Sequence, residues 1–345
     1  VTNHAKLVPR PEGVIPRCLP GFKVSLYATG LEAPRYIKTA PNGDFFVSEA
    51  TAENGVNKIL VFRGITAEGK PQQMEVFATG LKQPFGIAFY PPGPNPEFIY
   101  IANTDAVLRF PYKNSDLRAR AASQTVVSDI PGGGKLAGGG HWTRDIAFSR
   151  DGRKMYVSVG SHSNLDEVDN NPVEHHRANI LEYNPDGSAE RVYAWGIRNP
   201  VGIAINPQTG ELWTSVNERD TLGDNLVPDY ITHVTDGGFY GWPWFYMGPY
   251  QDPHFQGKHP ELKQKVLTPD VLLQPHDASI EMVFYEGSQF PSRYKGDIFA
   301  AEHGSWNKAV RSGYEIVRVP LKSGKSDGRY EDFLTGFITP HGQVW

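Results

Sequence analysis

The chain has 345 residues, with 34 Lys and Arg against 38 Asp and Glu, which gives a net charge of −4. This mild acidity without a basic stripe gives no electrostatic reason to expect a nucleic-acid partner, and no apolar run approaches the ~18 residues of a transmembrane helix. The single cysteine, Cys18, excludes an internal disulfide and a thiolate metal cluster.

Residues 1–21 are expected to form an N-terminal extension ahead of the first repeated phrase. The sequence begins at Val1 without an initiator methionine or an apolar targeting segment, which is typical of a mature exported protein or of a trimmed chain. We favour export and expect a periplasmic or secreted location. Residues 22–345 are expected to form a single domain, because large all-β folds often exceed the usual domain length.

One phrase recurs along the chain, each time with an apolar run, a turn and a second strand after it. It reads YATGLEAPRYIKTA at 27–40, FATGLKQPFGIAFY at 77–90 and YAWGIRNPVGIAIN at 193–206; GGGHWTRDIAF at 138–148 and EMVFYEGSQF at 281–290 open two looser copies. Their anchors, at spacings of 50, 59, 57 and 79 residues, are Ile37, Ile87, Ile146, Ile203 and Met282. Units of this length, filled by about four strands each, indicate a β-propeller.

We therefore expect an all-β, six-bladed β-propeller with four-stranded antiparallel blades. The long last spacing reflects an insertion at about 217–274 that is rich in aromatic residues. The segment YEDFLTGFITPHGQVW begins a sixth unit through its LTGF phrase, and the sequence then stops at Trp345, which leaves the sixth blade incomplete. An unfinished blade has a long unpaired edge, so we expect the natural chain to continue further.

Equivalent loops of successive propeller blades meet around the central channel. Three sets of positions belong to such loops. The first set lies five residues before each anchor, the second lies four residues before it, and the third lies just after the second strand of each unit. They are, in turn, Glu32, Lys82, His141, Arg198 and Asp277; Ala33, Gln83, Trp142, Asn199 and Ala278; and Glu49, Asn103, Ser161, Glu218 and His303. We therefore expect His141 and Arg198 to face the same opening.

Converging polar groups beside an aromatic wall are typical of a ligand site, although a solvated loop rim fits the same residues. Arg198 has a planar fork suited to carboxylate or carbonyl oxygens, and Asn199 beside it can both donate and accept. A neutral histidine such as His141 can accept a proton. Together these residues indicate acid–base chemistry on an anionic or quinoid ligand.

Two further stretches are candidates for metal binding. NERDTLGDNLVPDY at 217–230 is dense in carboxylates, which with turn carbonyls suit calcium; an acidic surface loop is the alternative. VEHHRAN at 173–179 contains His175 and His176, but adjacent side chains on a strand point to opposite faces and do not easily chelate one metal.

Several phrases resemble the soluble glucose/sorbosone dehydrogenases that use pyrroloquinoline quinone (PQQ), above all the sorbosone or aldose sugar dehydrogenase branch. They are GGGHWTRDIAF, WGIRNPVGIAI, VNERDTLGDNLVPDYI followed by GGFYGWPW, and AEHGSWN, and the likeness runs from about Phe22 to Trp345. It implies a six-bladed propeller with PQQ and calcium at the channel mouth. It also implies that an aldose or a sugar aldehyde is oxidised by hydride transfer to the quinone, and that a quinone, cytochrome or dye then accepts the electrons.

The resemblance also implies residue roles. His141 is the general base, Arg198 stabilises charge that grows on a quinone oxygen, and Asn199 orients the quinone. Arg311 lies near the position of a further cation of the family, and the backbone carbonyls of Arg219 and Asp220 hold calcium. Together with the ring positions and the acidic stretch, the resemblance gives the full list of predicted site residues. The catalytic residues are His141 and Arg198; the cofactor-binding residues are Arg198, Asn199, Trp142, Gln83, His303 and Arg311; and the metal-binding residues are Arg219, Asp220 and Asp224.

The chain departs from the best-known glucose dehydrogenases, which have Gly-Pro in place of Arg219–Asp220 and an acidic residue in place of Gly140. Glucose is therefore not assumed to be the substrate. Two other function classes stay open. A calcium-dependent propeller lactonase or hydrolase needs several acidic or amide side chains at the channel centre, where this ring offers Glu32 and Asp277. A non-catalytic binding propeller leaves His141, after its glycines, without a role.

Overall fold

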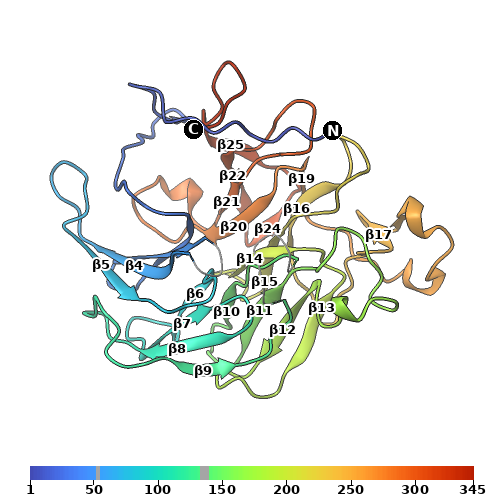
Figure 1. Cartoon of the computed structure of the whole chain (residues 1–345), viewed down its shortest axis with the longest axis horizontal. Helices are drawn as coiled ribbons and strands as arrows, with labels where there is room; N and C mark the ends of the chain where they lie inside the picture. Colours follow the sequence, from blue (N-terminus) through green and yellow to red (C-terminus); the bar gives the residue numbers. More distant parts are fainter. Residues whose placement is uncertain (52–54, 133–139) are drawn as a thin grey trace. The chain divides into compact units, whose positions relative to one another are not determined.

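The computed structural model describes residues 1–51, 55–132 and 140–345 (Figure 1), so Gly138 and Gly139 of the phrase before His141 lie outside the described residues. The described chain consists of short strands, with four 3-10 turns and five antiparallel sheets of four or five strands. No helix in these ranges has the length and apolar character needed to cross a membrane. Two compact units result: Val1–Ser25, Asn164–Glu167 and Ala194–Trp345 form unit 1, and Leu26–Ser163 and Val168–Tyr193 form unit 2.

Unit 2 carries three four-stranded sheets, in each of which strands that follow one another along the chain are neighbours. The strands that begin these sheets, β2, β6 and β10, contact one another in chain order. The sheets are β2 (Pro34–Thr39), β3 (Phe45–Ala50), β4 (Asn57–Arg63) and β5 (Gln73–Ala78); β6 (Ile87–Tyr90), β7 (Phe98–Ala102), β8 (Val107–Pro111) and β9 (Gln124–Val127); and β10 (Ile146–Phe148), β11 (Met155–Val159), β12 (Asn179–Tyr183) and β13 (Arg191–Trp195).

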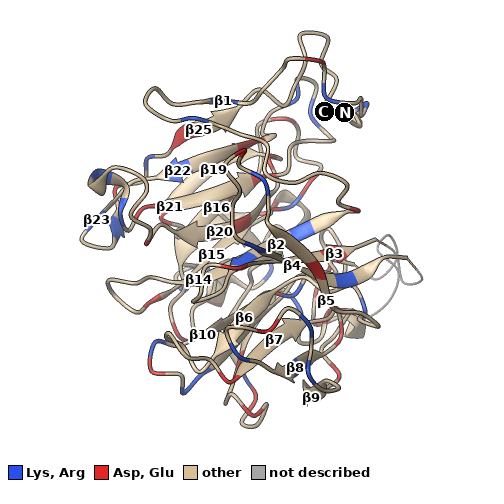
Figure 2. Cartoon of the chain, turned by 90° about the vertical axis from the view of Figure 1, so that its left-hand side faces the viewer, with Lys and Arg blue, Asp and Glu red and all other residues tan. Residues whose placement is uncertain are grey.

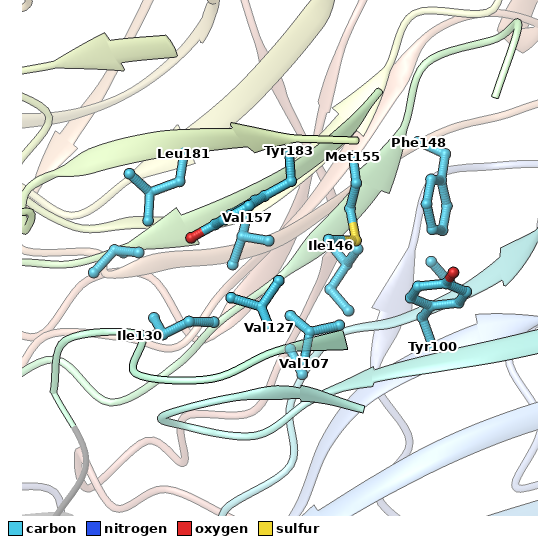
Figure 3. Close-up of a cluster of buried hydrophobic side chains, with 13 residues drawn as sticks. Tyr100, Val107, Val127, Ile130, Ile146, Phe148, Met155, Val157, Leu181 and Tyr183 are labelled. Atoms are coloured by element: carbon cyan, nitrogen blue, oxygen red, sulfur yellow. The ribbon is translucent and has the colours of Figure 1, made fainter. Parts of the chain in front are cut away.

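The apolar core of unit 2 fills the space between the second and third of these sheets (Figure 3). Tyr100 and Val107 from one sheet pack with Ile146, Met155 and Val157 from the other, and all five are buried. All five residues of β11, MYVSV, are buried, which is the pattern of a strand covered on both faces. Burial of β-branched and aromatic side chains thus holds neighbouring sheets together.

Charged residues of both signs lie along the first sheet of unit 2, as the colours of Figure 2 show near β3 and β4. Lys58 of β4 lies 3.1 Å from the buried carboxylate of Glu49, and Arg63 lies 2.6 Å from that of Asp44. A buried carboxylate is costly unless it is paired. These pairs therefore tie β4 to Glu49 of β3 and to Asp44, the residue just before β3.

Unit 1 carries the two remaining sheets, whose first strands β14 and β20 contact each other. Their shared core includes Trp213, Ile231, Val271, Met282 and Ile298. The first sheet is β14 (Pro200–Ile205), β15 (Leu212–Val216), β16 (Pro228–His233) and β19 (Val271–Pro275); the second is β20 (Ser279–Phe284), β21 (Ile298–Glu302), β22 (Glu315–Val319), β25 (Glu331–Thr335) and β1 (Arg17–Cys18). Two small hairpins, β17 (Phe245–Tyr246) with β18 (Tyr250–Gln251) and β23 (Leu321–Lys322) with β24 (Lys325–Ser326), lie outside these sheets.

The five repeat anchors each lie on the first strand of a sheet, so the sequence repeat identifies five blades of an all-β propeller. No new sheet follows the LTGF phrase in the described residues. Its first residues end β25, which pairs with β22 inside the fifth sheet. The sixth blade, and with it the six-bladed count, stays a prediction.

The predicted extension and insertion both contain blade strands. Arg17 and Cys18 of the extension form β1, which pairs antiparallel with Thr335 and Leu334 of β25. Within residues 217–274, β16 is an ordinary third strand, and the extra chain between two blade strands runs from 234 to 270. That segment holds β17, β18 and the 3-10 turns η2 (Pro253–Phe255) and η3 (Pro260–Leu262). The prediction of a single domain over residues 22–345 stays a prediction.

Candidate functional site

Within each blade, the loop before the first strand meets the end of the second strand, as the repeat predicts. The hydrogen bonds that join them are Glu32 N to the Glu49 carboxylate, Lys82 N to Asn103 Oδ1 (3.2 Å), His141 N to Ser161 O (3.0 Å), Arg198 Nη1 to Glu218 O (2.8 Å) and His303 N to Ala278 O (3.0 Å). The wider prediction, that His141 and Arg198 face one opening, stays a prediction.

The backbone of these loops is held in unusual conformations at equivalent positions. Ala33, Gln83 and Ala278, each one residue after a predicted ring position, have left-handed φ values of 53°, 49° and 57°. Such conformations are costly for residues other than glycine and cluster at functional sites. Bulges follow directly in β2, β14 and β20, and a bulge redirects the side chains next to it.

In unit 2, the imidazole of His141 is oriented by Ser161. Nδ1 lies 2.8 Å from the Ser161 carbonyl oxygen and 3.0 Å from its hydroxyl oxygen, and that hydroxyl donates to the carbonyl of Ser163 at 2.6 Å. Because both oxygens act as acceptors toward the ring, Nδ1 carries the proton in the neutral imidazole. The other nitrogen, Nε2, then has the basic lone pair.

Trp142 and Gln83 also lie on the loops of unit 2. The Arg35 guanidinium lies 5.3 Å from the centre of the Trp142 ring, and Phe85 meets that ring edge-on at 6.2 Å. Gln83 is fully buried, and neither its amide oxygen nor its amide nitrogen has a hydrogen-bond partner among the described residues. A buried amide without partners is costly, so Gln83 is suited to a group supplied by a ligand.

In unit 1, the buried guanidinium of Arg198 is held by several oxygens. Nε donates to the carbonyl of Asn164 (3.1 Å), Nη1 to that of Glu218 (2.8 Å) and Nη2 to the side-chain oxygen of Asn164 (2.9 Å). Nη2 also lies 3.4 Å from a carboxylate oxygen of Asp220. The next residue, Asn199, buries its Oδ1 without a partner among the described residues. Sequence reasoning missed Asn164, which belongs to no repeated phrase.

Asp220 links Arg198 to a small cavity. Its other oxygen accepts from Asn307 Nδ2 (2.7 Å) and faces His276 Nδ1 (3.3 Å), while His276 Nε2 lies 2.8 Å from the carbonyl of Gly223. The cavity, about 120 Å³, is lined by Thr221, Gly223, His276, Trp306 and Asn307, with Val1 and Thr2 of the N-terminal segment. Its polar groups, among them His276 and Asn307, both bonded to Asp220, make this cavity suited to an oxygen-bearing ligand.

Hydrogen bonding and charge set the ionisation of this pair. The hydrogen bond to Asp220 raises the pKa of His276 against the effect of burial. Burial would raise the pKa of Asp220, but hydrogen bonds from His276 and Asn307 and the charge of Arg198 lower it below its ordinary value. In both residues these contacts therefore favour the charged form over the neutral one.

The predicted metal residues have these contacts. The side chain of Arg219 is buried and forms an ion pair with the equally buried Asp252 at 3.0 Å. The carbonyl of Asp220 accepts from Asn164 Nδ2 (3.2 Å), and Asp224 accepts from Ala309 N (2.9 Å). In the described part of the chain, no three His, Cys, Asp or Glu side chains gather to hold a metal ion. Binding through backbone carbonyls stays a prediction.

The two remaining predicted cofactor residues belong to the fifth blade. His303 is exposed. Arg311 donates to the carbonyl of Gly342 (2.8 Å), to the side chain of Asn3 (2.7 Å) and to the carbonyl of His4, so it binds the N-terminal segment. Their contact with a cofactor stays a prediction.

Buried carboxyl groups join the loops of unit 1, and one of them, Asp229, was not singled out by the sequence. The carboxylate of Asp229 accepts from Glu218 N and from Ala278 N, each at 2.7 Å, and so links the fourth blade to the fifth. Burial raises the pKa of Asp229 and of Glu218 to about 7, and that of Asp277 to about 6. The sequence repeat does not mark Asp229, because its contacts with Glu218 and Ala278 become visible only in the folded structure.

Comparison with known proteins gives a family match over most of the chain. The TrAA12-like family model matches residues 16–233 and 250–334. A PQQ-dependent pyranose dehydrogenase of Coprinopsis cinerea is 24% identical, and the match covers 87% of this chain and 44% of that protein. The chain thus spans less than half the length of that relative.

Solved structures share the fold. The holo form of the pyranose dehydrogenase PQQ domain from Coprinopsis cinerea superposes with a TM-score of 0.76 at 22% identity, covering 97% of this chain and 90% of that one. The calcium structure of the Trichoderma reesei carbohydrate-active enzyme of family AA12 has a TM-score of 0.76 at 20% identity, covering 93% and 87%. At these identities the likeness concerns the fold.

Proposed function

This chain belongs to the TrAA12-like family, and on that premise we propose that it is a PQQ- and calcium-dependent dehydrogenase of an aldose or of a sugar aldehyde such as sorbosone. Its named relatives include PQQ-dependent pyranose dehydrogenases and an aldose sugar dehydrogenase of Escherichia coli. A quinone, cytochrome or dye would accept the electrons. We also propose a periplasmic or secreted location.

The observation that supports this function most is the fixed imidazole of His141. Its Nδ1–H is bonded to the Ser161 carbonyl at 2.8 Å, so Nε2 is the nitrogen that would take a proton. Sugar oxidation requires removal of a proton from the hydroxyl whose carbon loses hydride. A neutral histidine with one nitrogen anchored is suited to this step, because the anchor sets both the tautomer and the direction of the lone pair.

The residues present fit a quinone that carries carboxylates. Such a group offers anionic oxygens. Arg198 provides positive charge close to the cavity of unit 1, and the imidazole of His276, whose pKa is raised by Asp220, lines that cavity. The amide of Gln83 and the Oδ1 of Asn199, which have no hydrogen-bond partner among the described residues, add hydrogen-bonding capacity. When bound, PQQ would supply the two-electron acceptor that no side chain can provide. Arg198 would stabilise negative charge on an oxygen of the bound group, because its position is already fixed by Asn164 and Glu218.

The loop from 217 to 224 fits a calcium ion. It provides carbonyl oxygens at Arg219 and Asp220 and carboxylates at Asp220 and Asp224, which are the hard donors that calcium prefers. The buried ion pair between Arg219 and Asp252 fixes the loop from the side of the insertion. Arg219, Asp220 and Asp224 are thus the residues proposed to hold the metal.

Reconstitution tests this proposal directly. The apo protein is supplied with PQQ and calcium, and dye reduction is followed with a panel of aldoses and sugar aldehydes. We expect substrate-dependent reduction that needs both additions, and its loss in His141→Ala. His175→Ala, an exposed histidine of the same unit, is the matched control and should keep activity. A lack of dye reduction together with lactone hydrolysis would favour the hydrolase class, and a fully active His141→Ala would refute the proposed base.

A further inference from the structure

The 3-10 turn η1 (Pro172–Glu174) and the residues just after it place two buried charged side chains, Glu174 and Arg177, against the loops around His141. The sequence suggested histidine chemistry here, but His175 and His176 are exposed, do not lie on a strand, and stack on each other at 4.2 Å. The neighbouring Glu174 accepts from the backbone N–H of His162 (2.8 Å) and of Ser163 (2.7 Å). Glu174 therefore fixes the loop that carries Ser161.

Arg177 binds the backbone of both loops at once. It is 4% exposed. Its Nε donates to the carbonyl of Gly160 at 2.9 Å, and its Nη2 donates to those of His141 at 3.0 Å and Ser161 at 3.3 Å. The Ser161 carbonyl is the same oxygen that accepts from His141 Nδ1. One guanidinium fork thus sets the distance between the imidazole and its anchor.

Arg144, three residues after His141, adds a second fully buried guanidinium. Its Nη1 donates to the carbonyls of His141 (2.9 Å) and Thr143 (2.6 Å), and its Nη2 to that of Pro131 (2.5 Å). The His141 carbonyl therefore accepts from both arginines. A Cβ on Gly132 would lie 2.2 Å from Arg144 Nη2 and 2.8 Å from Arg177 Nη1, so this glycine leaves the space that the two side chains occupy.

Burying two like charges side by side is expensive, and apolar side chains would support a loop at less cost. Their fork geometry does what an apolar side chain cannot, because several N–H groups in one plane fix several carbonyls relative to one another. Here the fixed carbonyls belong to the general base and to the residue that orients it.

We propose that Arg144 and Arg177 are positioning residues for His141: by binding the carbonyls of His141 and Ser161, they hold the imidazole in the tautomer and direction in which Nε2 takes the substrate proton. This inference rests on the proposed function, because it takes His141 as the base. Neither arginine is placed in contact with substrate or cofactor.

Two measurements on Arg177→Lys and Arg144→Lys test the inference. Lysine keeps the charge but not the fork, so we expect kcat to fall roughly 10- to 100-fold through misplacement of the base, with KM within about twofold. Arg153→Lys, at an exposed arginine in the turn between β10 and β11, is the control and should keep both constants. In ¹⁵N-histidine spectra of the apo protein, the His141 signals, assigned by their absence in His141→Gln, should show protonated Nδ1 in the wild type and a tautomer mixture in the two variants.

The spectra decide the inference independently of the proposed function. If the wild type reduces no dye with any sugar, the proposed function fails while the tautomer measurement still applies. Folded lysine variants with wild-type His141 signals would overturn the inference, as would a raised KM at unchanged kcat. If neither lysine variant folds, Glu174→Gln takes their place. In that variant the His141 signals should shift toward a tautomer mixture, to a smaller extent than expected for the lysine variants, and unchanged His141 signals would count against the inference.

Discussion

Removal of one partner of the buried ion pair between Arg219 and Asp252 is expected to destabilise the protein strongly. Each residue is only 1% exposed, and Arg219 Nε lies 3.0 Å from Asp252 Oδ2. Asp252→Asn leaves a buried positive charge without its counter-charge, which costs about 3–5 kcal/mol. Asparagine keeps the Oδ1 acceptor, which caps η2 by accepting a hydrogen bond from His254 N at 2.9 Å. The loss of unfolding free energy therefore measures the effect of the missing charge and not that of a missing cap. Asp252→Ala removes both and adds about 1 kcal/mol.

Urea unfolding followed by tryptophan fluorescence measures this loss, since Trp242 and Trp244 are buried in the same insertion. With an m-value of ~3 kcal/mol/M, the Asp252→Asn midpoint falls by about 1–1.7 M. Asp151→Asn is the control. It breaks an ion pair in which Asp151 Oδ2 lies only 2.6 Å from Arg153 Nε, but both partners are exposed, so no measurable shift of the urea midpoint is expected. A midpoint for Asp252→Asn within about 0.3 M of the wild type would refute the reasoning. The double variant Arg219→Met with Asp252→Leu should recover most of the loss.

Three further predictions concern packing, pH and metal. Gly202→Ala should lower the unfolding free energy by about 1–3 kcal/mol, because its Cβ would lie 2.5 Å from the Ile280 carbonyl and push β14 away from β20. Thermal unfolding measures this loss, and an unchanged melting temperature would contradict it. Burial, with help from the charge of Asp332, raises the pKa of Glu315 from 4.5 to about 7 in the folded protein. The protonated side chain therefore contributes its full stability to the fold below about pH 4.5, and this contribution is lost as the pH rises through about 7. Glu315→Gln should therefore raise the melting temperature at pH 8 and leave it unchanged at pH 4, and equal shifts at both pH values would contradict that sign. Chelation of calcium should abolish PQQ-dependent dye reduction and calcium should restore it better than magnesium, which needs a tighter octahedral shell; full activity in excess chelator would remove the metal from the proposal.

The sequence repeat predicts much of the fold because blade positions recur. Ile37, Ile87, Ile146, Ile203 and Met282 all lie on first strands, since the same apolar run must cover the same neighbour in each blade. For the same reason, the pairing of His141 with Ser161 follows from counting along matching strands. A repeat carries only what the blades have in common.

Residues outside the repeat could not be predicted in this way. Asn164, Asp252 and Arg177 act through contacts made by segments that occur once in the chain, and nothing in their local sequence marks a partner 34, 33 or 36 residues away. When two residues are separated by a long connection, the local sequence does not determine whether they meet, because the surrounding sheets set their positions. The shared opening for His141 and Arg198 and the sixth blade also stay predictions, because both concern how blades close around an axis.

The pairing of β1 with β25 has a consequence for how the chain is made. Arg17 and Thr335 are partners in one sheet, although almost the entire polypeptide separates them. A ribosome adding ~5–20 residues per second reaches Thr335 roughly 15 to 60 seconds after Cys18. During that interval the early strand has no edge to join, so the fifth sheet can reach its final width only after Thr335 has been synthesised. Chaperone protection of the nascent N-terminal region would therefore matter most in this window.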